Sequence, residues 1–301
     1  MTLYDLRDPR FAGLIHRNAQ LRQIGSGFEW AEGPVWFPLS QMLLFSDIPA
    51  HRMMRWTAES GCTIFREDSD YSNGNTRDPQ GRLVTCHHGL RAVCRTEHDG
   101  SRTVLADSYQ GKRLNSPNDV VVRSDGSVWF TDPTYGILSD LEGYRADPEQ
   151  AGSYVWRIPA DGGAPQPVIT DFTQPNGLCF SPDETLLYVA ESGSSHDPGV
   201  PSVIRVFDVQ GDKVTNGRDF AVIDRGLPDG IRCDTNGNLW SSAADGVHVF
   251  APDGTLLGKI NVPEVVSNIC FGGPRGNRLF ITATTSLYVV AVNAAAAGWP
   301  G

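Results

Sequence analysis

The chain has 301 residues, of which 40% are hydrophobic, and it carries a formal net charge of −10 at pH 7. This length and apolar content suffice for a large core, whereas the acidic balance argues against binding to nucleic acid or to anionic membranes, which requires basic surfaces. The 32 glycines and 20 prolines are scattered, and no linker divides the chain. Many short strands joined by turns have this composition, so we expect one all-β domain over residues 1–301.

The first 18 residues, MTLYDLRDPRFAGLIHRN, contain no uninterrupted apolar segment. We therefore expect an N-terminal extension over 1–18 without a secretory signal, no membrane span elsewhere, and a cytoplasmic location. The six cysteines form no CxxC pair. In a chain without an export signal, they are expected to be free thiols.

A turn followed by a short apolar strand recurs six times. The copies are PLSQMLLFSD (38–47), DPQGRLVTC (78–86), SDGSVWFTD (124–132), SPDETLLYVAE (181–191), DTNGNLWSS (234–242) and PRGNRLFIT (274–282). A polar residue precedes each copy by a similar distance. These residues are Glu32, Asn75, Asn118, Asn176, Asp229 and Asn268. Apart from two visible insertions, at 136–153 and 192–202, the period is roughly 40 residues, which is typical of a four-stranded propeller blade.

Third and fourth strands follow each copy, except that the sixth unit has no fourth strand after Val292. The segment AQLRQIGSGF (19–28) precedes the first unit and can supply that strand, which would close the ring and remove open sheet edges. We therefore predict a six-bladed β-propeller with four-stranded blades that start near residues 32, 75, 118, 176, 229 and 268. A β-sandwich gives no reason for six polar residues in register, and a β-helix has much shorter coils.

The first strand of each propeller blade lines the central channel, so the six polar residues should form a ring around one axis. Each offers a carboxylate or amide oxygen, and such hard donors suit Ca²⁺ or Mg²⁺. Asn or Asp before Gly or Val is also common in turns, where the side chain caps the backbone. Six oxygen donors in one register favour a divalent-cation site over six unrelated turns.

Four longer strings carry a family resemblance. EGPVW, NSPNDVVVRSDGSVWFTDPTYG, PNGLCFSPDETLLYVAES and PDGIRCDTNGNLW resemble the gluconolactonase / senescence-marker-protein (regucalcin) / luciferin-regenerating family, and most closely its bacterial sugar-lactonase branch. The resemblance implies a six-bladed propeller with a divalent cation, usually Ca²⁺, at the channel mouth, with Mg²⁺, Mn²⁺ or Zn²⁺ as alternatives. Carried over position by position, it places candidate metal ligands at Glu32, Asn176, Asp229 and Asn118, the last of which contacts metal water or substrate.

Further candidates for substrate contact are Asn118, Asp119, His88 and Tyr135. Asp119 follows Asn118 in a strand, so its side chain should point the other way and support the site. Tyr135 and the 136–153 insertion are expected to form part of a lid. Two departures from the family concern substrate contacts. Ser116 stands where animal members carry a substrate-binding Arg, and HHGLRAV stands where bacterial members tend to have HGNRRV.

The implied reaction is hydrolysis of a sugar-acid lactone such as gluconolactone, with the cation acting on the carbonyl oxygen, on a bound water, or on both. Asp229 is the predicted general base for the attacking water, and Asp119 is the alternative. Two other functions remain open, namely phosphotriester or aryl-ester hydrolysis on the same fold and a non-enzymatic calcium-binding propeller. The expected partner is a small sugar lactone; the particular lactone, the native metal, a second metal site and the oligomeric state stay open.

Overall fold

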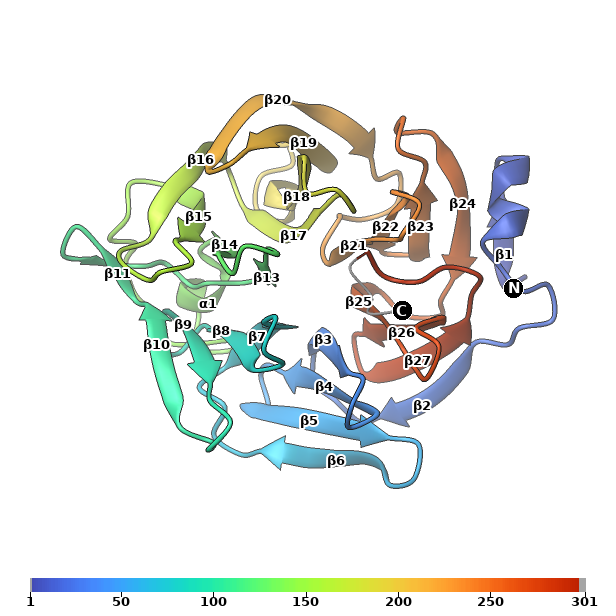
Figure 1. Ribbon diagram of the computed structural model, residues 1–301, viewed down its shortest axis with the longest axis horizontal. Helices are drawn as coiled ribbons and strands as arrows, with labels where there is room; N and C mark the ends of the chain where they lie inside the picture. Colours follow the sequence, from blue (N-terminus) through green and yellow to red (C-terminus); the bar gives the residue numbers. More distant parts are fainter. Residues whose placement is uncertain (1, 298–301) are drawn as a thin grey trace.

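The computed structural model describes residues 2–297, which form six antiparallel sheets arranged as blades around a central channel (Figure 1). This confirms the predicted six-bladed β-propeller. In the first three blades, the strands follow the chain outward from the channel. They are β3 (Ala31–Phe37), β4 (Met42–Asp47), β5 (Arg52–Thr57) and β6 (Gly61–Arg66); β7 (Ser72–Arg77), β8 (Leu83–His87), β9 (Ala92–Thr96) and β10 (Arg102–Ala106); and β13 (Val120–Val122), β14 (Val128–Asp132), β15 (Ser153–Ile158) and β16 (Gln166–Phe172).

The last three blades repeat this order, and the sixth is completed from the other end of the sequence. Their strands are β17 (Pro175–Phe180), β18 (Leu186–Glu191), β19 (Val203–Gln210) and β20 (Lys213–Val222); β21 (Ile231–Cys233), β22 (Leu239–Ala243), β23 (Gly246–Phe250) and β24 (Leu256–Asn261); and β25 (Val266–Gly272), β26 (Arg278–Ala283) and β27 (Ser286–Ala291). The outer strand of the sixth blade is β2 (Arg22–Ser26), which pairs antiparallel with β27. The strand predicted within 19–28 therefore closes the ring.

The N-terminal extension is part of the folded structure, which the sequence did not reveal. Strand β1 (Tyr4–Leu6) pairs with β24 as a fifth strand of the fifth blade, and the short 3₁₀ helix η1 (Pro9–Gly13) follows it. Phe11 of η1 is fully buried in a cluster that includes Trp240 and Val249. A Cβ atom at Gly258 would overlap the Phe11 ring, so the glycine makes room for it.

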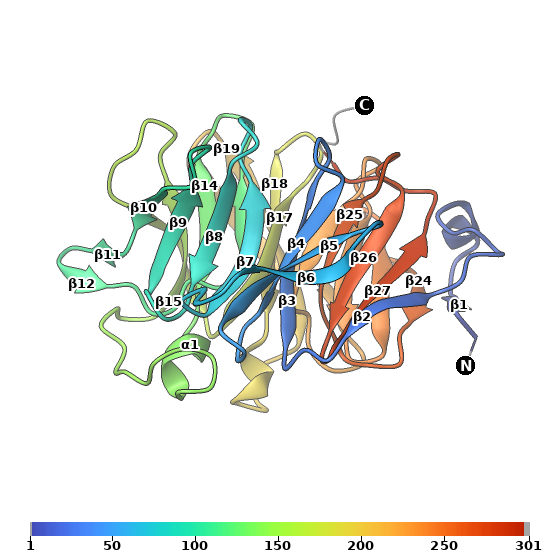
Figure 2. The same ribbon diagram turned by 90° about the horizontal axis from the view of Figure 1, so that it is seen from below.

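Two insertions place short helices at one end of the channel. Helix α1 (Tyr135–Leu138) begins the first insertion, and the 3₁₀ helix η2 (Gly193–Ser195) begins the second. Figure 2 shows both at the same edge of the propeller, and the Tyr135 hydroxyl joins them through a hydrogen bond of 3.0 Å to Ser195 Oγ. A two-stranded ribbon, β11 (Ser108–Tyr109) and β12 (Lys112–Arg113), links the second and third blades. No helix within residues 2–297 has the length and apolar character to cross a membrane.

The first strands approach so closely around the channel that glycine is required between them. Gly33 has a positive φ of 55°, and a Cβ atom there would overlap the carbonyl oxygen of Asn73 in the next blade. A Cβ atom at Gly177 would similarly overlap the carbonyl oxygen of Asp229, to which the Gly177 N–H donates at 3.2 Å. This backbone contact between neighbouring blades fixes the position of the residue that precedes each glycine.

The burial of Phe11 predicts that the N-terminal extension stabilises the propeller. Phe11→Ala removes a fully buried ring and should lower the free energy of unfolding by about 3–5 kcal/mol. The measurement is urea denaturation followed by tryptophan fluorescence. Leu39→Ala is the matched control, because Leu39 is fully exposed and its loss should change stability by no more than about 0.5 kcal/mol. Equal midpoints for the two variants would show that η1 does not contribute.

Candidate functional site

A cavity of about 190 Å³ opens at the end of the channel where α1 and η2 lie. It is lined by Trp30, Glu32, Ile48, Asn73, Asn118, Tyr135, Glu142, Asn176, Ser192, Ser195, Leu227 and Asp229. All four predicted metal ligands are in this set, although they come from four different blades. The cavity therefore brings together three carboxyl groups, of Glu32, Glu142 and Asp229, and several amide oxygens that are far apart in the sequence.

The second blade contributes Asn73 to this cavity, whereas the sequence pattern pointed to Asn75. The Asn75 side chain is used within the protein instead, because its Nδ2 donates to Gly33 O at 2.9 Å and its Oδ1 accepts from Thr85 Oγ1 at 2.8 Å. A sequence signal for Asn73 existed. An oxygen donor followed by glycine occurs as Glu-Gly, Asn-Gly, Asn-Gly and Asp-Gly at 32–33, 73–74, 176–177 and 229–230.

Asn268, the sixth member of the predicted ring, supports the site from outside the cavity. Its Nδ2 donates to Glu32 Oε2 at 2.9 Å, and the backbone N–H of Gly33 also donates to that oxygen. Its Oδ1 accepts from the backbone N–H of Ile269 at 2.8 Å. Asn268 therefore holds the Glu32 carboxylate in place.

Two acidic side chains of the cavity are held in an environment that disfavours their charge. Burial, followed by the negative charge of Asp119, raises the pKa of Glu32 to about 8. Burial and the charge of Glu32 raise the pKa of Asp229 well above its ordinary value, against a hydrogen bond from Asn176 that acts in the opposite direction. Glu142, on the insertion that begins with α1, also has a pKa raised by burial. A cation in the cavity would favour the ionised form of all three groups.

Asp119, a predicted substrate contact, is not among the residues that line the cavity. Its Oδ1 accepts from the backbone N–H of Val120 at 2.9 Å, and its Oδ2 lies 3.3 Å from Arg232 Nη1. Both charged side chains are largely buried. Asp119 therefore forms a largely buried ion pair with Arg232, and its supporting role stays a prediction.

His88 is fully buried and positions a residue of the cavity without lining it. Its Nδ1 lies 2.9 Å from the carbonyl oxygen of Glu142, so this nitrogen carries the proton and donates. Its Nε2 then accepts from Asn73 Nδ2 at 3.1 Å, which leaves Asn73 Oδ1 for the cavity. Burial lowers the pKa of His88 to about 4, so the ring is neutral at pH 7. His88 thus joins the insertion to Asn73.

Tyr135 lines the cavity at the start of α1, and its role in a lid stays a prediction. Its hydroxyl donates to Ser192 O at 3.1 Å and lies 3.0 Å from Ser195 Oγ.

Ser116, which replaces the arginine of animal family members, has a purely structural environment. Its Oγ donates to Pro133 O at 2.6 Å and accepts from Gly136 N at 3.0 Å, so it anchors α1 to the third blade.

A second acidic group lies outside the channel. Asp224, Asp245 and His248 have ligand-type atoms within 4.8 Å of one another. The buried Lys259 occupies this group, because its Nζ donates to Asp224 Oδ1 at 2.6 Å and to Asp245 Oδ2 at 3.0 Å. The ammonium already supplies the positive charge that a metal would bring.

The fold and the site together define a class of protein. Its members are six-bladed propellers with an acidic, oxygen-lined cavity at one mouth of the channel. The family described as SMP-30/Gluconolactonase/LRE-like region matches residues 30–285, and the chain belongs to this family. A gluconolactonase from Zymomonas mobilis is 36% identical, over 92% of this chain and 82% of that protein. A pentonolactonase from Haloferax volcanii is 28% identical, over 87% of this chain and 84% of that protein.

The fold comparison agrees with the sequence comparison. The solved structure of a gluconolactonase from Xanthomonas campestris superposes with a TM-score of 0.90 at 38% identity, covering 96% of this chain and 94% of that one. The resemblance seen in the sequence motifs is therefore confirmed.

All six cysteines are free, as expected, and Cys179, Cys233 and Cys270 are buried on the first strands of their blades.

The raised pKa of Glu32 predicts how stability depends on pH when no divalent cation is present. Between the ordinary value of 4.5 and about 8, the unfolded chain ionises this carboxyl while the folded protein keeps the proton. Rising pH therefore favours the unfolded state, with a slope of up to about 1.4 kcal/mol per pH unit for each such group. Urea denaturation in EDTA at pH 5, 6, 7 and 8 measures this slope.

Glu32→Gln should reduce the loss of stability between pH 5 and 8, because the amide has no proton to lose. Glu59→Gln, at an exposed position, is the control and should leave the slope unchanged. The same slope in Glu32→Gln and in the unsubstituted protein would contradict the assigned pKa of Glu32.

Proposed function

We propose that this protein opens sugar-acid lactones such as gluconolactone, with a divalent cation held at the channel mouth by Glu32, Asn118, Asn176 and Asp229. The chain is a carboxylic-ester hydrolase of the lactonase type, as predicted, because its relatives named gluconolactonase and pentonolactonase align over most of its length. The observation that carries the proposed mechanism is the gathering of Glu32 and Asp229 with amide side chains in one cavity.

The cavity fits a hard divalent cation. None of its lining residues is lysine or arginine, and the nearby Arg232 is paired with Asp119. Two buried carboxyl groups whose pKa values are raised by burial and by neighbouring negative charge need a positive charge to remain ionised together. The other donors are amide oxygens, and an all-oxygen set with room for water favours Ca²⁺, with Mg²⁺, Mn²⁺ or Zn²⁺ as alternatives.

When bound, a divalent cation would supply Lewis-acid stabilisation of the negative charge that develops on the lactone carbonyl oxygen, and would acidify water. We assign Asp229 as the general base that takes a proton from the attacking water. Water adds to the carbonyl carbon, the ring C–O bond breaks, and the leaving oxygen is protonated to give the hydroxy acid. Asn118 and Tyr135 offer polar contacts for the sugar, while Trp30 and Leu227 provide apolar wall.

His88 and Asp119 act in this scheme through other residues. His88 fixes the amide of Asn73, and Asp119 pairs with Arg232 beneath the cavity.

The two alternative functions make different predictions. A phosphotriesterase or aryl esterase would turn over those esters and not lactones, and a non-enzymatic calcium-binding propeller would bind Ca²⁺ without turnover. A panel of lactones, aryl esters and phosphotriesters distinguishes the three.

Removing the cation with EDTA and removing its ligand side chains by substitution should both lower lactone turnover. In a pH-indicator assay with gluconolactone, EDTA should abolish turnover and Ca²⁺ should restore it, while Mg²⁺, Mn²⁺ and Zn²⁺ rank the alternatives. Glu32→Gln and Asp229→Asn should each lower kcat/KM by on the order of 10²-fold or more. Asp224→Asn, in the group occupied by Lys259, is the matched control and should stay close to unsubstituted activity. Turnover that is unaffected by EDTA would refute the mechanism.

The choice of general base can be tested separately from cation binding. Asp119 accepts from Val120 and Arg232 outside the cavity, so Asp119→Asn should lower kcat by no more than about tenfold and keep the limb that reports the base. That limb should move to lower pH, because the negative charge of Asp119 contributes to the raised pKa of Asp229. Asp229→Asn should remove the limb of the profile that reports the base, even at cation concentrations that saturate the site. The measurement is kcat against pH, with Ca²⁺ affinity determined in parallel. Loss of that limb in Asp119→Asn alone would assign the base to Asp119.

A further inference from the structure

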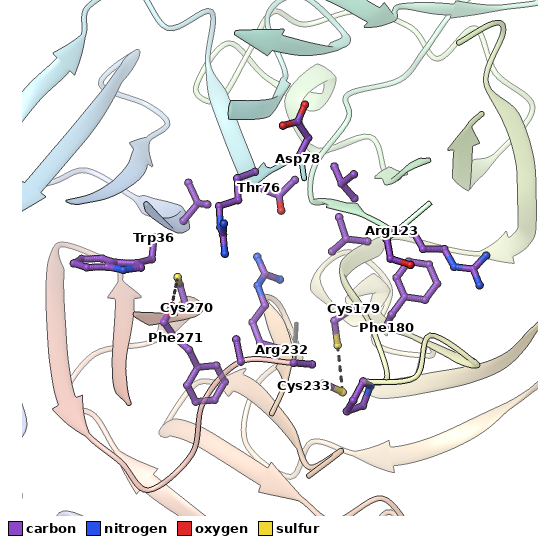
Figure 3. Close-up of a pocket in the computed structure, with 18 of the residues that line it drawn as sticks. Trp36, Thr76, Asp78, Arg123, Cys179, Phe180, Arg232, Cys233, Cys270 and Phe271 are labelled. Atoms are coloured by element: carbon purple, nitrogen blue, oxygen red, sulfur yellow. Dashed lines mark hydrogen bonds between the residues drawn. The ribbon is translucent and has the colours of Figure 1, made fainter. Parts of the chain in front are cut away.

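A second cavity, of about 420 Å³, opens at the other end of the channel. The first strands all run in the same direction, so residues later in each strand line this end. Trp36 follows Glu32 on β3, and Phe180 follows Asn176 on β17. Figure 3 shows Trp36, Phe180 and Phe271 around the wall, with the Arg232 guanidinium directed toward the middle.

Two guanidinium groups in this cavity have unused hydrogen-bond donors. No ion pair or side-chain hydrogen bond within residues 2–297 involves Arg77, which is half-buried at the end of β7. Arg232 uses Nη1 for Asp119 and for Ile231 O, whereas its Nε and Nη2 have no partner in the part of the chain described. Arg77, Arg232 and Cys270 all line this cavity. Burial raises the pKa of the Cys270 thiol to about 11, and the positive charges of Arg232 and Arg77 oppose this rise.

The acidic side chains that line this cavity already have partners. Asp78 Oδ2 accepts from Arg82 Nε at 2.7 Å, and Glu184 Oε2 accepts from Arg123 Nε at 3.2 Å. Asp119, which pairs with Arg232, lies behind that arginine and is not part of the cavity wall. The cavity therefore carries a local excess of positive charge in a protein whose net charge is −10.

We propose that this cavity binds a small organic anion whose charged end pairs with Arg77 and Arg232. Guanidinium groups present forked N–H donors that match the oxygens of a carboxylate or a phosphate. The walls formed by Trp36, Phe180 and Phe271 suit an apolar or aromatic body. A metal cation is disfavoured, because both arginines repel it. This site is distinct from the acidic cavity and does not depend on the lactonase function.

Isothermal titration calorimetry in EDTA tests the site, with benzoate, gluconate and inorganic phosphate as probes on the full chain. Benzoate should bind saturably, since it combines a carboxylate with an aromatic body. Binding of gluconate as well would show that the carboxylate suffices, and tighter binding of phosphate would assign the phosphate group as the preferred anion. Each result supports the anion site and identifies its chemistry.

Two variants connect the binding to the arginines. Arg77→Gln should weaken binding by at least about tenfold. Arg232→Lys keeps the ion pair with Asp119 but loses the forked donors, so it should also weaken binding. Arg66→Gln, on the outer strand β6, is the control for loss of one positive charge elsewhere and should bind as the unsubstituted protein does. Thermal unfolding verifies that each variant is folded. Failure of all three probes to bind, or unchanged affinity in Arg77→Gln, would overturn the proposal.

Discussion

The six first strands converge on the channel until their backbones touch, and most other features of the molecule depend on this contact. Gly33 and Gly177 lie where a side chain would overlap a carbonyl oxygen of the next blade. Hydrogen bonds from glycine N–H groups then tie one blade to the next, as between Gly74 and Asn118 O at 2.8 Å. The oxygen donors that precede these glycines are consequently held by backbone, and their geometry does not depend on flexible loops.

The same packing has an electrostatic cost. Glu32 and Asp229 are placed close together and away from water, where their charges repel one another. Hydrogen bonds from Asn268 and from the Gly33 N–H stabilise the charge of Glu32. Arg232 offsets the negative charge of Asp119, with which it is paired. A rigid frame around two destabilised carboxyl groups is a prepared site for positive charge, because little reorganisation is needed when a cation arrives.

The repeat was readable from the sequence because each blade begins with turn residues and ends in an apolar strand, and because the period is nearly constant. The ring of polar residues could be predicted from the sequence except at Asn73, because spacing alone selected Asn75. The reason why glycine follows the oxygen donor becomes evident only once the first strands are seen to touch. The docking of β1 and η1 was not readable, because residues 4–13 have no counterpart in the other blades. The arginine cavity was also missed, since Arg77 and Arg232 look like ordinary polar positions of exposed strands and become neighbours only through closure of the ring.

The pairing of β2 with β27 has a consequence for how the protein is made. A ribosome releases β2 long before β27, so β2 has no partner strand until the strands of the sixth blade have emerged. The first five blades can form from local contacts during translation, but the ring stays open at one seam, with β2 exposed as an unpaired strand. Final closure joins segments with very large sequence separation, and contacts of this kind form slowly. The seam is therefore the part of the molecule most in need of protection while it is still nascent.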